Sequence, residues 1–291
     1  MKKHKSGTLG LLYVSPWLLG LLAFRLYPFV YSLLCSFTDF RLFDAETEFV
    51  GLDNYKLIFT DEKIISSLGR TFLYVLLTVP LKLAVSLAVA CLLCRSLRGI
   101  GLFRTAFYIP SLLGGSVAVS VLWKALFRDG GPVSFMAELF GLPSQSWLGD
   151  YSQALMVIVL LRVWQFGSSM IIFLAALKAV PRELYESASL DGAGRLRSFV
   201  RITLPMISPV MLYNLVMQLA EVFQEFNAPY IVTQGGPRGS TTFFSLLIYK
   251  KAFRENELGM ASAMAWILFL IVSVFCTVAF LSRRKWVFYR D

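Results

Sequence analysis

The chain contains 291 residues, of which 57% are hydrophobic and only 16% are charged. This balance excludes an ordinary soluble domain and predicts a membrane protein that crosses the bilayer several times. Basic loops on the cytoplasmic side of such a protein explain the formal net charge of +10. We therefore expect membrane lipid, and no nucleic acid, among its partners.

Histidine and cysteine are too scarce for most metal or nucleophile chemistry. The one histidine, His4, belongs to a basic tail, and the four cysteines fall in or at the ends of apolar runs. Cys91 and Cys94 form a C-x-x-C pair without a second pair or clustered histidine. We expect packing roles for the cysteines, no metal site and no catalytic residue. No cleavable signal peptide is expected, because the first apolar run is too long and lacks a small-residue cleavage site.

A helix needs about 20 apolar residues to cross the hydrocarbon core of a bilayer. Several stretches meet this requirement, and open sheet edges are not tolerated in lipid. The sequence therefore predicts an all-α polytopic membrane protein with six transmembrane helices. The six stretches are 11–36, 71–94, 103–127, 154–177, 205–232 and 259–281.

Basic residues are concentrated in the two tails and in the second and fourth connections between spans. This placement predicts that both termini and these connections face the cytoplasm, with tails at 1–10 and 283–291 around a membrane domain at 11–282. The acidic loop after the first span is assigned to the outside, although the fifth loop, also assigned outside, is basic. The residues that carry the prediction are Lys2, Lys3, Lys5, Arg95, Arg98, Arg104, Lys178, Arg182, Arg195, Arg197, Arg201, Arg283, Arg284, Lys285 and Arg290.

Two of the predicted spans are interrupted by turn-forming or basic residues. Pro110, Gly114 and Gly115 make the third span locally breakable, which is typical both of cavity-lining segments and of close helix packing. Arg162 lies deep in the fourth span. We expect it to pair with an acidic residue of the fifth span rather than to contact a substrate.

The interval 181–209 is unusually polar for this chain. Its first half predicts a short helix that begins at Pro181 and ends at a left-handed cap on Gly192. A second short helix, 195–203, is expected to end before Pro205. Small residues between the two helices suit close contact with another protein's groove, although an ordinary cytoplasmic loop has the same composition.

The residue types in this interval and their spacing distinguish a docking segment from an ordinary loop. Glu186-Ser187-Ala188, Asp191-Gly192-Ala193 and Ile202-Thr203-Leu204-Pro205 closely resemble the "EAA" loop of permeases in binding-protein-dependent ATP-binding-cassette (ABC) importers. The family's spacing is intact, and Ser187 replaces the usual first alanine with another small residue. The resemblance implies a type I importer permease in the cell (inner, cytoplasmic) membrane. It also implies that 181–209 holds a cytoplasmic coupling helix, which docks into a cleft of a separate ATPase subunit.

Other segments resemble permeases of the carbohydrate-uptake branch of this family. Within that branch they resemble the subunit type that is related to the larger maltose permease. The resemblance implies a sugar or oligosaccharide substrate, a second homologous permease, two ATPase subunits that bind ATP and Mg, and an extracytoplasmic solute-binding protein. No cofactor is implied for this chain itself. The chain lacks the extra N-terminal helix pair and the large insertion of the maltose protein. The segments are Tyr27-Pro28, Ser36-Phe37-Thr38, 49–55, Trp164, Gly235-Gly236-Pro237, Tyr249 and Phe253.

The fifth predicted span is rich in amides and carboxylates. Steps of four, three and four residues place four polar side chains on one helical face, and a fifth flanks it. Such a face offers hydrogen-bond partners to sugar hydroxyl groups, with aromatic faces at Phe223 and Trp164, although interhelical bonds are the alternative. If ionised, its two acids would repel anionic substrates. The predicted pathway residues are Asn214, Gln218, Glu221, Gln224, Glu225 and Trp164.

Two other function classes need different features. The chain has no G-x-x-x-x-G-K motif, so we expect a non-catalytic transport subunit whose partners hydrolyse ATP. A self-sufficient ion-coupled secondary transporter is the alternative, with Glu221 and Glu225 as ion sites, but no clear internal repeat supports it. An intramembrane enzyme would need motifs such as H-E-x-x-H or G-x-S-x-G, which do not occur.

Overall fold

The computed structural model describes residues 4–44, 46–94, 99–141 and 146–288. Within these residues every regular element is helical and β-pairing is limited to isolated bridges, so the predicted all-α fold is confirmed. Some of the basic residues used to predict the orientation lie outside the described residues. They are Lys2, Lys3, Arg95, Arg98 and Arg290.

The helices of the described residues agree with the predicted number of spans. Four are long and apolar enough to cross a membrane, and two further pairs are bent by 99° and 44° at short breaks. Counting each bent pair as one span gives six. The four are Tyr13–Cys35, Glu62–Leu93, Arg195–Phe223 and Leu258–Trp286, and the pairs are Ile100–Leu112 with Val117–Leu139 and Tyr151–Trp164 with Gly167–Ala179.

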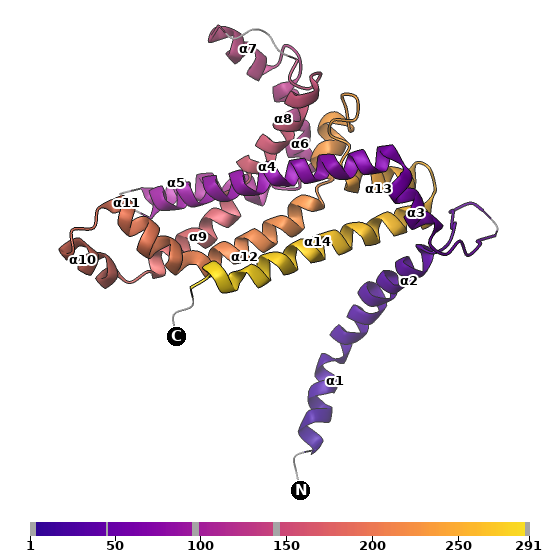
Figure 1. Cartoon of the computed structure of the whole chain (residues 1–291), viewed down its shortest axis with the longest axis horizontal. Helices are drawn as coiled ribbons and strands as arrows, with labels where there is room; N and C mark the ends of the chain where they lie inside the picture. The colour runs from indigo at the N-terminus through magenta and orange to yellow at the C-terminus, as the bar shows by residue number, and fades with distance from the viewer. Residues whose placement is uncertain (1–3, 45, 95–98, 142–145, 289–291) are drawn as a thin grey trace. The chain divides into compact units, whose positions relative to one another are not determined.

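The chain divides into two compact units. Figure 1 labels most of their helices. Unit 1 comprises the residues up to Ile65 and Ile248–Phe269, and unit 2 comprises Ser66–Leu247 and the residues from Leu270 onward. The elements of unit 1 are α1 (His4–Leu21), the π-helical turn η1 (Leu22–Leu26), α2 (Tyr27–Cys35), α3 (Asp53–Thr60) and parts of α4 (Glu62–Leu93), α13 (Phe244–Phe253) and α14 (Leu258–Trp286). Unit 2 holds the rest of α4, α13 and α14 with α5 (Ile100–Leu112), α6 (Val117–Phe127), α7 (Pro132–Leu139), α8 (Tyr151–Trp164), α9 (Gly167–Ala179), α10 (Arg182–Leu190), α11 (Arg195–Ser198), η2 (Phe199–Thr203), α12 (Leu204–Phe223) and η3 (Pro229–Thr233).

In unit 1 the end of the first span is tied to the loop and helix that follow it. The side-chain amide of Asn54 donates to the backbone carbonyls of Ser36 (2.9 Å) and Thr38 (2.8 Å). Further along the span, the rings of Phe29 and Trp266 lie 4.5 Å apart between centroids. Because aromatic pairs at this separation pack favourably, they join α2 to the first half of α14.

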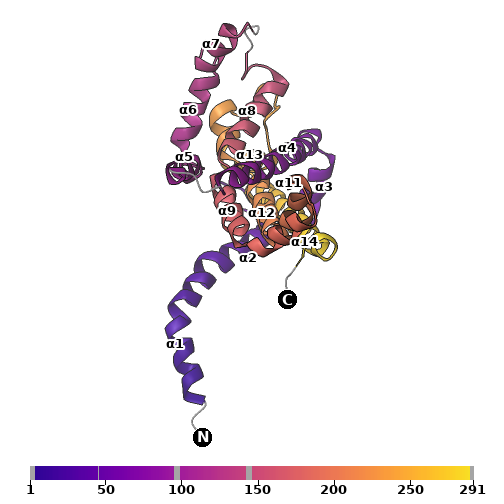
Figure 2. The same cartoon turned by 90° about the vertical axis from the view of Figure 1, so that its left-hand side faces the viewer.

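In unit 2 the core is centred on α9. Met170, Phe173 and Leu174 of α9 are buried against Ala90 and Leu93 of α4. Helices α5 and α12 also pack on α9, and Figures 1 and 2 show α9 and α12 as neighbours in both views. The second half of α14 is joined to α12 by the contact of Phe275 with Phe223, whose tilted rings have centroids 5.3 Å apart.

The third predicted span breaks where the sequence predicts. Helix α5 ends at Leu112 and α6 begins at Val117, with Gly115 between them at a φ of 80°. Such a φ favours glycine, because any Cβ would be strained there. The fourth span also breaks, at Gln165 and Phe166, which the sequence analysis does not anticipate. Here a Cβ on Gly167 would lie 2.5 Å from the carbonyl oxygen of Phe107, so only glycine allows α9 to start this close to α5.

Two predicted helix ends are wrong. The helix that starts at Arg195 does not stop before Pro205 but continues to Phe223. The π-helical turn η2 precedes Pro205 and places it in the first turn of α12, where a missing N–H is tolerated. Conversely, the predicted helix 205–232 ends early, at Phe223, and helical structure resumes in η3 with Pro229 in its first turn.

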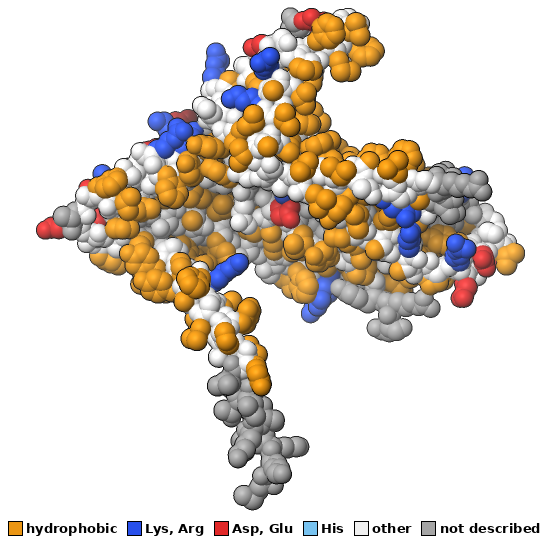
Figure 3. All heavy atoms as spheres, turned by 180° about the vertical axis from the view of Figure 1, so that it is seen from behind, with side chains coloured by type: hydrophobic (Ala, Val, Ile, Leu, Met, Phe, Trp, Pro, Cys, Tyr) orange, Lys and Arg blue, Asp and Glu red, His pale blue; other side chains and the backbone are white. Residues whose placement is uncertain are grey.

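The surface of the helices is apolar, as a lipid-facing surface requires. Hydrophobic side chains cover much of the face seen in Figure 3. Large side chains such as Leu76, Leu122 and Val274 are exposed on the long helices, where hydrocarbon rather than water is their natural solvent. Helix α8 begins at a polar boundary, where the carboxylate of Asp150 accepts hydrogen bonds from the backbone N–H groups of Gln153 and Ser152 (3.0 Å each). These bonds, with one from the Ser152 hydroxyl, lower the pKa of Asp150.

Candidate functional site

A pocket of about 420 Å³ opens in unit 2 beside the broken ends of the spans. Its walls come from the end of α8, from the last turns of α12 and from the loop that follows α12. Gly115, at the break between α5 and α6, completes it. The polar side chains that line the pocket are Arg162, Glu221, Gln224, Glu225 and Asn227.

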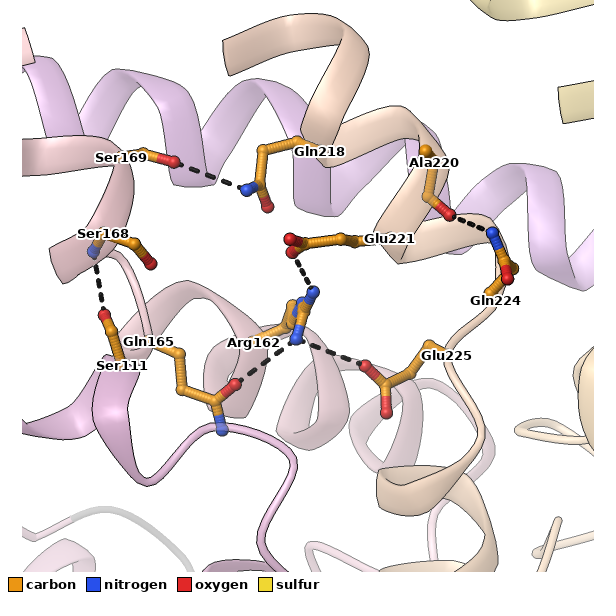
Figure 4. A network of polar contacts seen from close by, with 10 residues as sticks. All are labelled: Ser111, Arg162, Gln165, Ser168, Ser169, Gln218, Ala220, Glu221, Gln224 and Glu225. Carbon is orange, nitrogen blue, oxygen red and sulfur yellow. Dashed lines mark hydrogen bonds and ion pairs between the residues drawn. The ribbon is translucent and has the colours of Figure 1, made fainter. Parts of the chain in front are cut away.

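Arg162 organises these side chains (Figure 4). Its guanidinium lies 2.6 Å from the carboxylate of Glu221 and 3.8 Å from that of Glu225. The same group approaches Gln165 Oε1 at 3.5 Å. The side chains of Arg162 and Glu225 are 15% and 12% exposed, whereas Glu221 is 47% exposed and faces the opening more freely. The predicted pairing of Arg162 with the acids of the fifth span is confirmed in the geometry.

Lys82 of α4 is a buried basic residue near this network. It is 2% exposed and interacts electrostatically with Arg162, Glu221 and Glu225. Within the described residues it forms no ion pair with either carboxylate. A lysine inside an apolar run is itself a signal of a polar interior, although the sequence analysis assigns Lys82 no role.

The loop after α12 is held by hydrogen bonds rather than by helical pairing. Glu225 Oε1 accepts from the backbone N–H of Ala228 (3.2 Å), and the Gln224 amide donates to the carbonyl of Ala220 (2.8 Å). Asn227 donates to the carbonyl of Gly115 (3.0 Å) and thereby links this loop to the break between α5 and α6. Non-helical backbone at membrane depth is tolerated where it lines a cavity, which this loop does.

The structure brings only part of the predicted polar face together. Glu221, Gln224 and Glu225 line the pocket, but Glu225 lies beyond the end of α12, so the expectation of one continuous helical face is wrong. Asn214 and Gln218 are buried elsewhere along α12, and the Gln218 amide donates to Ser169 Oγ at 3.4 Å. The Gln218 bond follows the alternative expectation of interhelical bonding, whereas the Asn214 side-chain nitrogen is buried without a hydrogen-bond partner among the described residues. No sequence signal marks the early helix end, because Pro229 begins the next helical segment and Ala228 before it keeps right-handed helical backbone angles.

The aromatic residues expected beside the pocket lie elsewhere. Trp164 packs against Trp123 with ring centroids 5.6 Å apart, and it is not among the pocket-lining residues. Phe223 is fully buried between Phe72 and Phe275. The aromatic residue that lines the pocket is Phe226, which the sequence analysis does not single out.

A second candidate site is the interval between α9 and α12. Helix α10 ends at Leu190, Asp191 is its C-cap, and Gly192 follows at a φ of 74°, so the predicted left-handed cap is confirmed. The cap is closed by backbone bonds from Gly192 N–H to Ser189 and from Ala193 N–H to Ala188. Among the residues predicted to contact an ATPase, Glu186, Ser187, Asp191 and Gly192 are exposed, and Ala188 and Ala193 are half-buried.

This interval is ordered and yet presents apolar groups outward. The hydroxyls of Tyr185 and Thr203 share a hydrogen bond of 2.7 Å, which ties α10 to η2. Leu190 and Leu196, on either side of the Gly192 turn, are 89% and 77% exposed. Figure 1 shows α10 and α11 at one end of unit 2. Exposed leucines on a structured hairpin mark a surface that another protein can cover.

A polytopic helical bundle with a charged pocket at its broken helices and an exposed hairpin at one end defines a membrane transport subunit. Comparison with known proteins agrees with this class. Residues 59–286 match the family described as "Binding-protein-dependent transport system inner membrane component", and the chain belongs to that family. The predicted resemblance to permeases of ABC importers is confirmed, and the chain is a multi-pass membrane protein.

Individual relatives match over nearly the whole chain. The probable ABC transporter permease protein YesP of Bacillus subtilis (strain 168) is 41% identical over 299 residues, covering 100% of this chain and 96% of YesP. The multiple sugar-binding transport system permease protein MsmF of Streptococcus mutans is 31% identical, covering 86% of this chain and 87% of MsmF. A chain of a bacterial alginate ABC transporter, solved with an alginate pentasaccharide-bound periplasmic protein, has the same fold, with a TM-score of 0.84 at 22% identity and coverages of 97% and 96%.

Proposed function

We propose that this chain is a permease subunit of an ABC importer and that, with a second homologous permease, it encloses a path for a sugar or oligosaccharide. An extracytoplasmic binding protein would deliver the sugar, and two partner ATPase subunits would supply ATP and Mg. The chain itself would be non-catalytic and hold no cofactor. Both termini and α10 would face the cytoplasm. Family membership and the names of relatives such as MsmF support this assignment.

The single observation that carries the substrate class is the polar lining of the pocket around Arg162. Amide, carboxylate and guanidinium groups converge on an opening of about 420 Å³. Carboxylates accept from sugar hydroxyls, guanidinium groups donate to them, and amides do both. Phe226 offers an apolar ring face within the same lining. A small set of placed polar groups beside an apolar surface is the usual composition of a small-molecule site.

The pairing of the two acids changes the expected charge selectivity. The sequence alone indicates that Glu221 and Glu225 would repel an anionic solute. Arg162 contacts both carboxylates and offsets part of their negative charge. Net charge would therefore separate neutral from anionic sugars less strongly than the sequence alone indicates. Selectivity would also come from the hydrogen-bond geometry of Glu221, Gln224 and Asn227.

The exposed hairpin supports the coupling role. Helix α10 would fit a cleft of the ATPase subunit, with the half-buried Ala188 and Ala193 allowing close backbone approach. The Tyr185–Thr203 bond would pass a displacement of α10 into the continuous helix Arg195–Phe223, and α12 ends at the pocket. ATP-driven movement at one end of α12 would thereby reach the polar groups at the other end.

Reconstitution tests this function. A tagged chain is purified with its partners, the partners are identified by mass spectrometry, and uptake of radiolabelled oligosaccharides into proteoliposomes is measured with and without ATP. We expect a second permease and an ATPase in the complex, uptake that requires ATP, and neither hydrolysis nor uptake by the chain alone. Ion-driven uptake by the chain alone would instead establish the secondary-transporter alternative.

A further inference from the structure

A second and larger cavity of unit 2, of about 720 Å³, is separate from the Arg162 pocket and shares none of its lining residues. It lies where α4 ends and α10 begins, with further walls from α5, α9 and η2. This is the end of unit 2 at which Figure 1 shows α10 and α11. The proposed transport function assigns no role to this cavity.

The charged side chains that line this cavity are all cationic. Arg104, Lys178 and Arg182 contribute to its walls, and no carboxylate does. Within the described residues, none of the three forms an ion pair. Arg104 is held in place, because its Nη2 donates to the carbonyl of Leu93 at 2.8 Å, while its Nε is buried without a hydrogen-bond partner. Arg104 is half-buried, whereas Lys178 and Arg182 are exposed, so the cavity carries positive charge that an entering anion can neutralise.

The rest of the lining is mixed. The hydroxyls of Tyr185 and Thr203 supply polar groups, and Leu177, Val180 and Phe199 supply apolar surface. A ligand that satisfies this lining has an anionic part for the cations and an apolar part for the hydrophobic side chains. Phosphate is the anion that arginine and lysine clusters hold best, because its oxygens accept several charge-assisted hydrogen bonds at once.

We propose that this cavity binds a phosphate-bearing anion with an apolar portion, whose source is an anionic phospholipid of the adjacent leaflet. Basic pockets between membrane helices bind anionic headgroups in this way. The site includes Arg182 and Tyr185 of α10 and Thr203 of η2, so the bound headgroup braces the base of the α10 hairpin. The inference concerns lipid binding and does not depend on which solute is transported.

Native mass spectrometry of the purified full-length chain tests the site. The chain is titrated with phosphatidylglycerol or with zwitterionic phosphatidylcholine, and the bound lipid is counted. We expect preferential retention of phosphatidylglycerol, and a loss of about tenfold in its apparent affinity for Lys178→Gln/Arg182→Gln. Arg195→Gln/Arg197→Gln is the matched control, because it removes the same charge from exposed residues outside the cavity.

Two further experiments complete the test. Competition with inorganic phosphate identifies the source of the bound anion, and a charge-preserving variant controls for misfolding. Millimolar inorganic phosphate that displaces the lipid, with the same dependence on Lys178 and Arg182, would support the phosphate site and assign a free anion as its source. Arg104→Lys keeps the charge but loses the forked geometry, so it is expected to weaken retention less than the double variant. Equal retention of the two lipids, or equal losses in the cavity and control variants, would overturn the proposal.

Discussion

The guanidinium of Arg162 and the carboxylate of Glu221 lie 2.6 Å apart, although 59 positions separate them in the sequence. The pair joins the end of α8 to the last turn of α12. Through its contact with Glu225, the same arginine also holds the loop beyond α12. One cation thus fixes both acids of the pocket, and its removal would leave them facing each other.

Arg162→Met should therefore destabilise the protein, by about 3 kcal/mol, because it leaves the nearly buried Glu225 without its partner. The measurement is the midpoint of thermal unfolding in detergent. The double variant Arg162→Met/Glu225→Gln should recover part of the loss, since it also removes the stranded charge. Lys124→Met, which removes an exposed cation from α6, is the control and should change little. Strict additivity of the two single changes would contradict the pairing.

Glu221→Gln and Gln224→Ala should change the apparent KM for uptake by about tenfold, since each removes or alters a group that a sugar hydroxyl would meet. The unfolding midpoint of Gln224→Ala should stay close to that of the unsubstituted protein because Gln224 is exposed, and that of Glu221→Gln should fall only slightly because the amide oxygen can still accept from Arg162. Gln218→Leu is the matched comparison. It lies off the pocket and bonds Ser169, so it should alter stability and leave the substrate profile unchanged. An unchanged KM in both pocket variants would remove the pathway role.

Glu186→Lys should abolish ATP-dependent uptake while membrane insertion and thermal stability are retained, because the side chain is exposed and no ion pair of the described residues involves it. Glu183→Lys reverses the same charge one turn earlier on α10 and should have the weaker effect. Co-purification of the ATPase subunit with each variant is the direct readout. Equal retention of the ATPase by both variants and normal uptake would show that α10 does not dock there.

Gly192 offers a test of the turn itself. A Cβ at this position meets open space, so the only barrier to substitution is its φ of +74°. Gly192→Asn should preserve uptake, because asparagine tolerates this region, whereas Gly192→Val should cost about 1–2 kcal/mol locally and weaken ATPase binding. The two variants are compared by ATPase co-purification. Equal behaviour would mean that the left-handed turn is dispensable for docking.

Gly167→Ala should destabilise unit 2 by about 1–3 kcal/mol, because the added methyl group meets the backbone of α5. Gly101→Ala, on α5 itself, meets nothing within 4 Å and should be neutral or slightly stabilising, by about 0.5–1 kcal/mol. Both are measured as shifts in the unfolding midpoint. A neutral Gly167→Ala would show that α5 and α9 can separate without cost.

Elements that depend on local chemistry could be predicted from the sequence. The apolar runs locate the spans, Gly114 and Gly115 locate the first break, and Gly192 ends α10 as its left-handed preference requires. The family resemblance of the 181–209 interval could likewise be identified from the spacing of its residues.

Features that depend on tertiary contacts could not be predicted in this way. The break before Gly167 exists because α5 approaches there, and no local signal shows that approach. The division of the polar face, with Gln218 buried and Glu221 open, follows from the position of α9. The helix end at Phe223 likewise has no local signal, because the helical periodicity continues through it and Pro229 begins the next helical segment.

The hydrogen bond from Asn227 to the carbonyl of Gly115 joins two stretches of backbone that have left their helices. Each stretch on its own would leave backbone carbonyl groups at the edge of the pocket without a partner in the protein. The hydrogen bond couples the two stretches, so a movement of one would displace the other or break the bond. A substitution at position 227 that preserves this link therefore needs a side chain with an N–H or O–H of similar reach, whichever solute is transported.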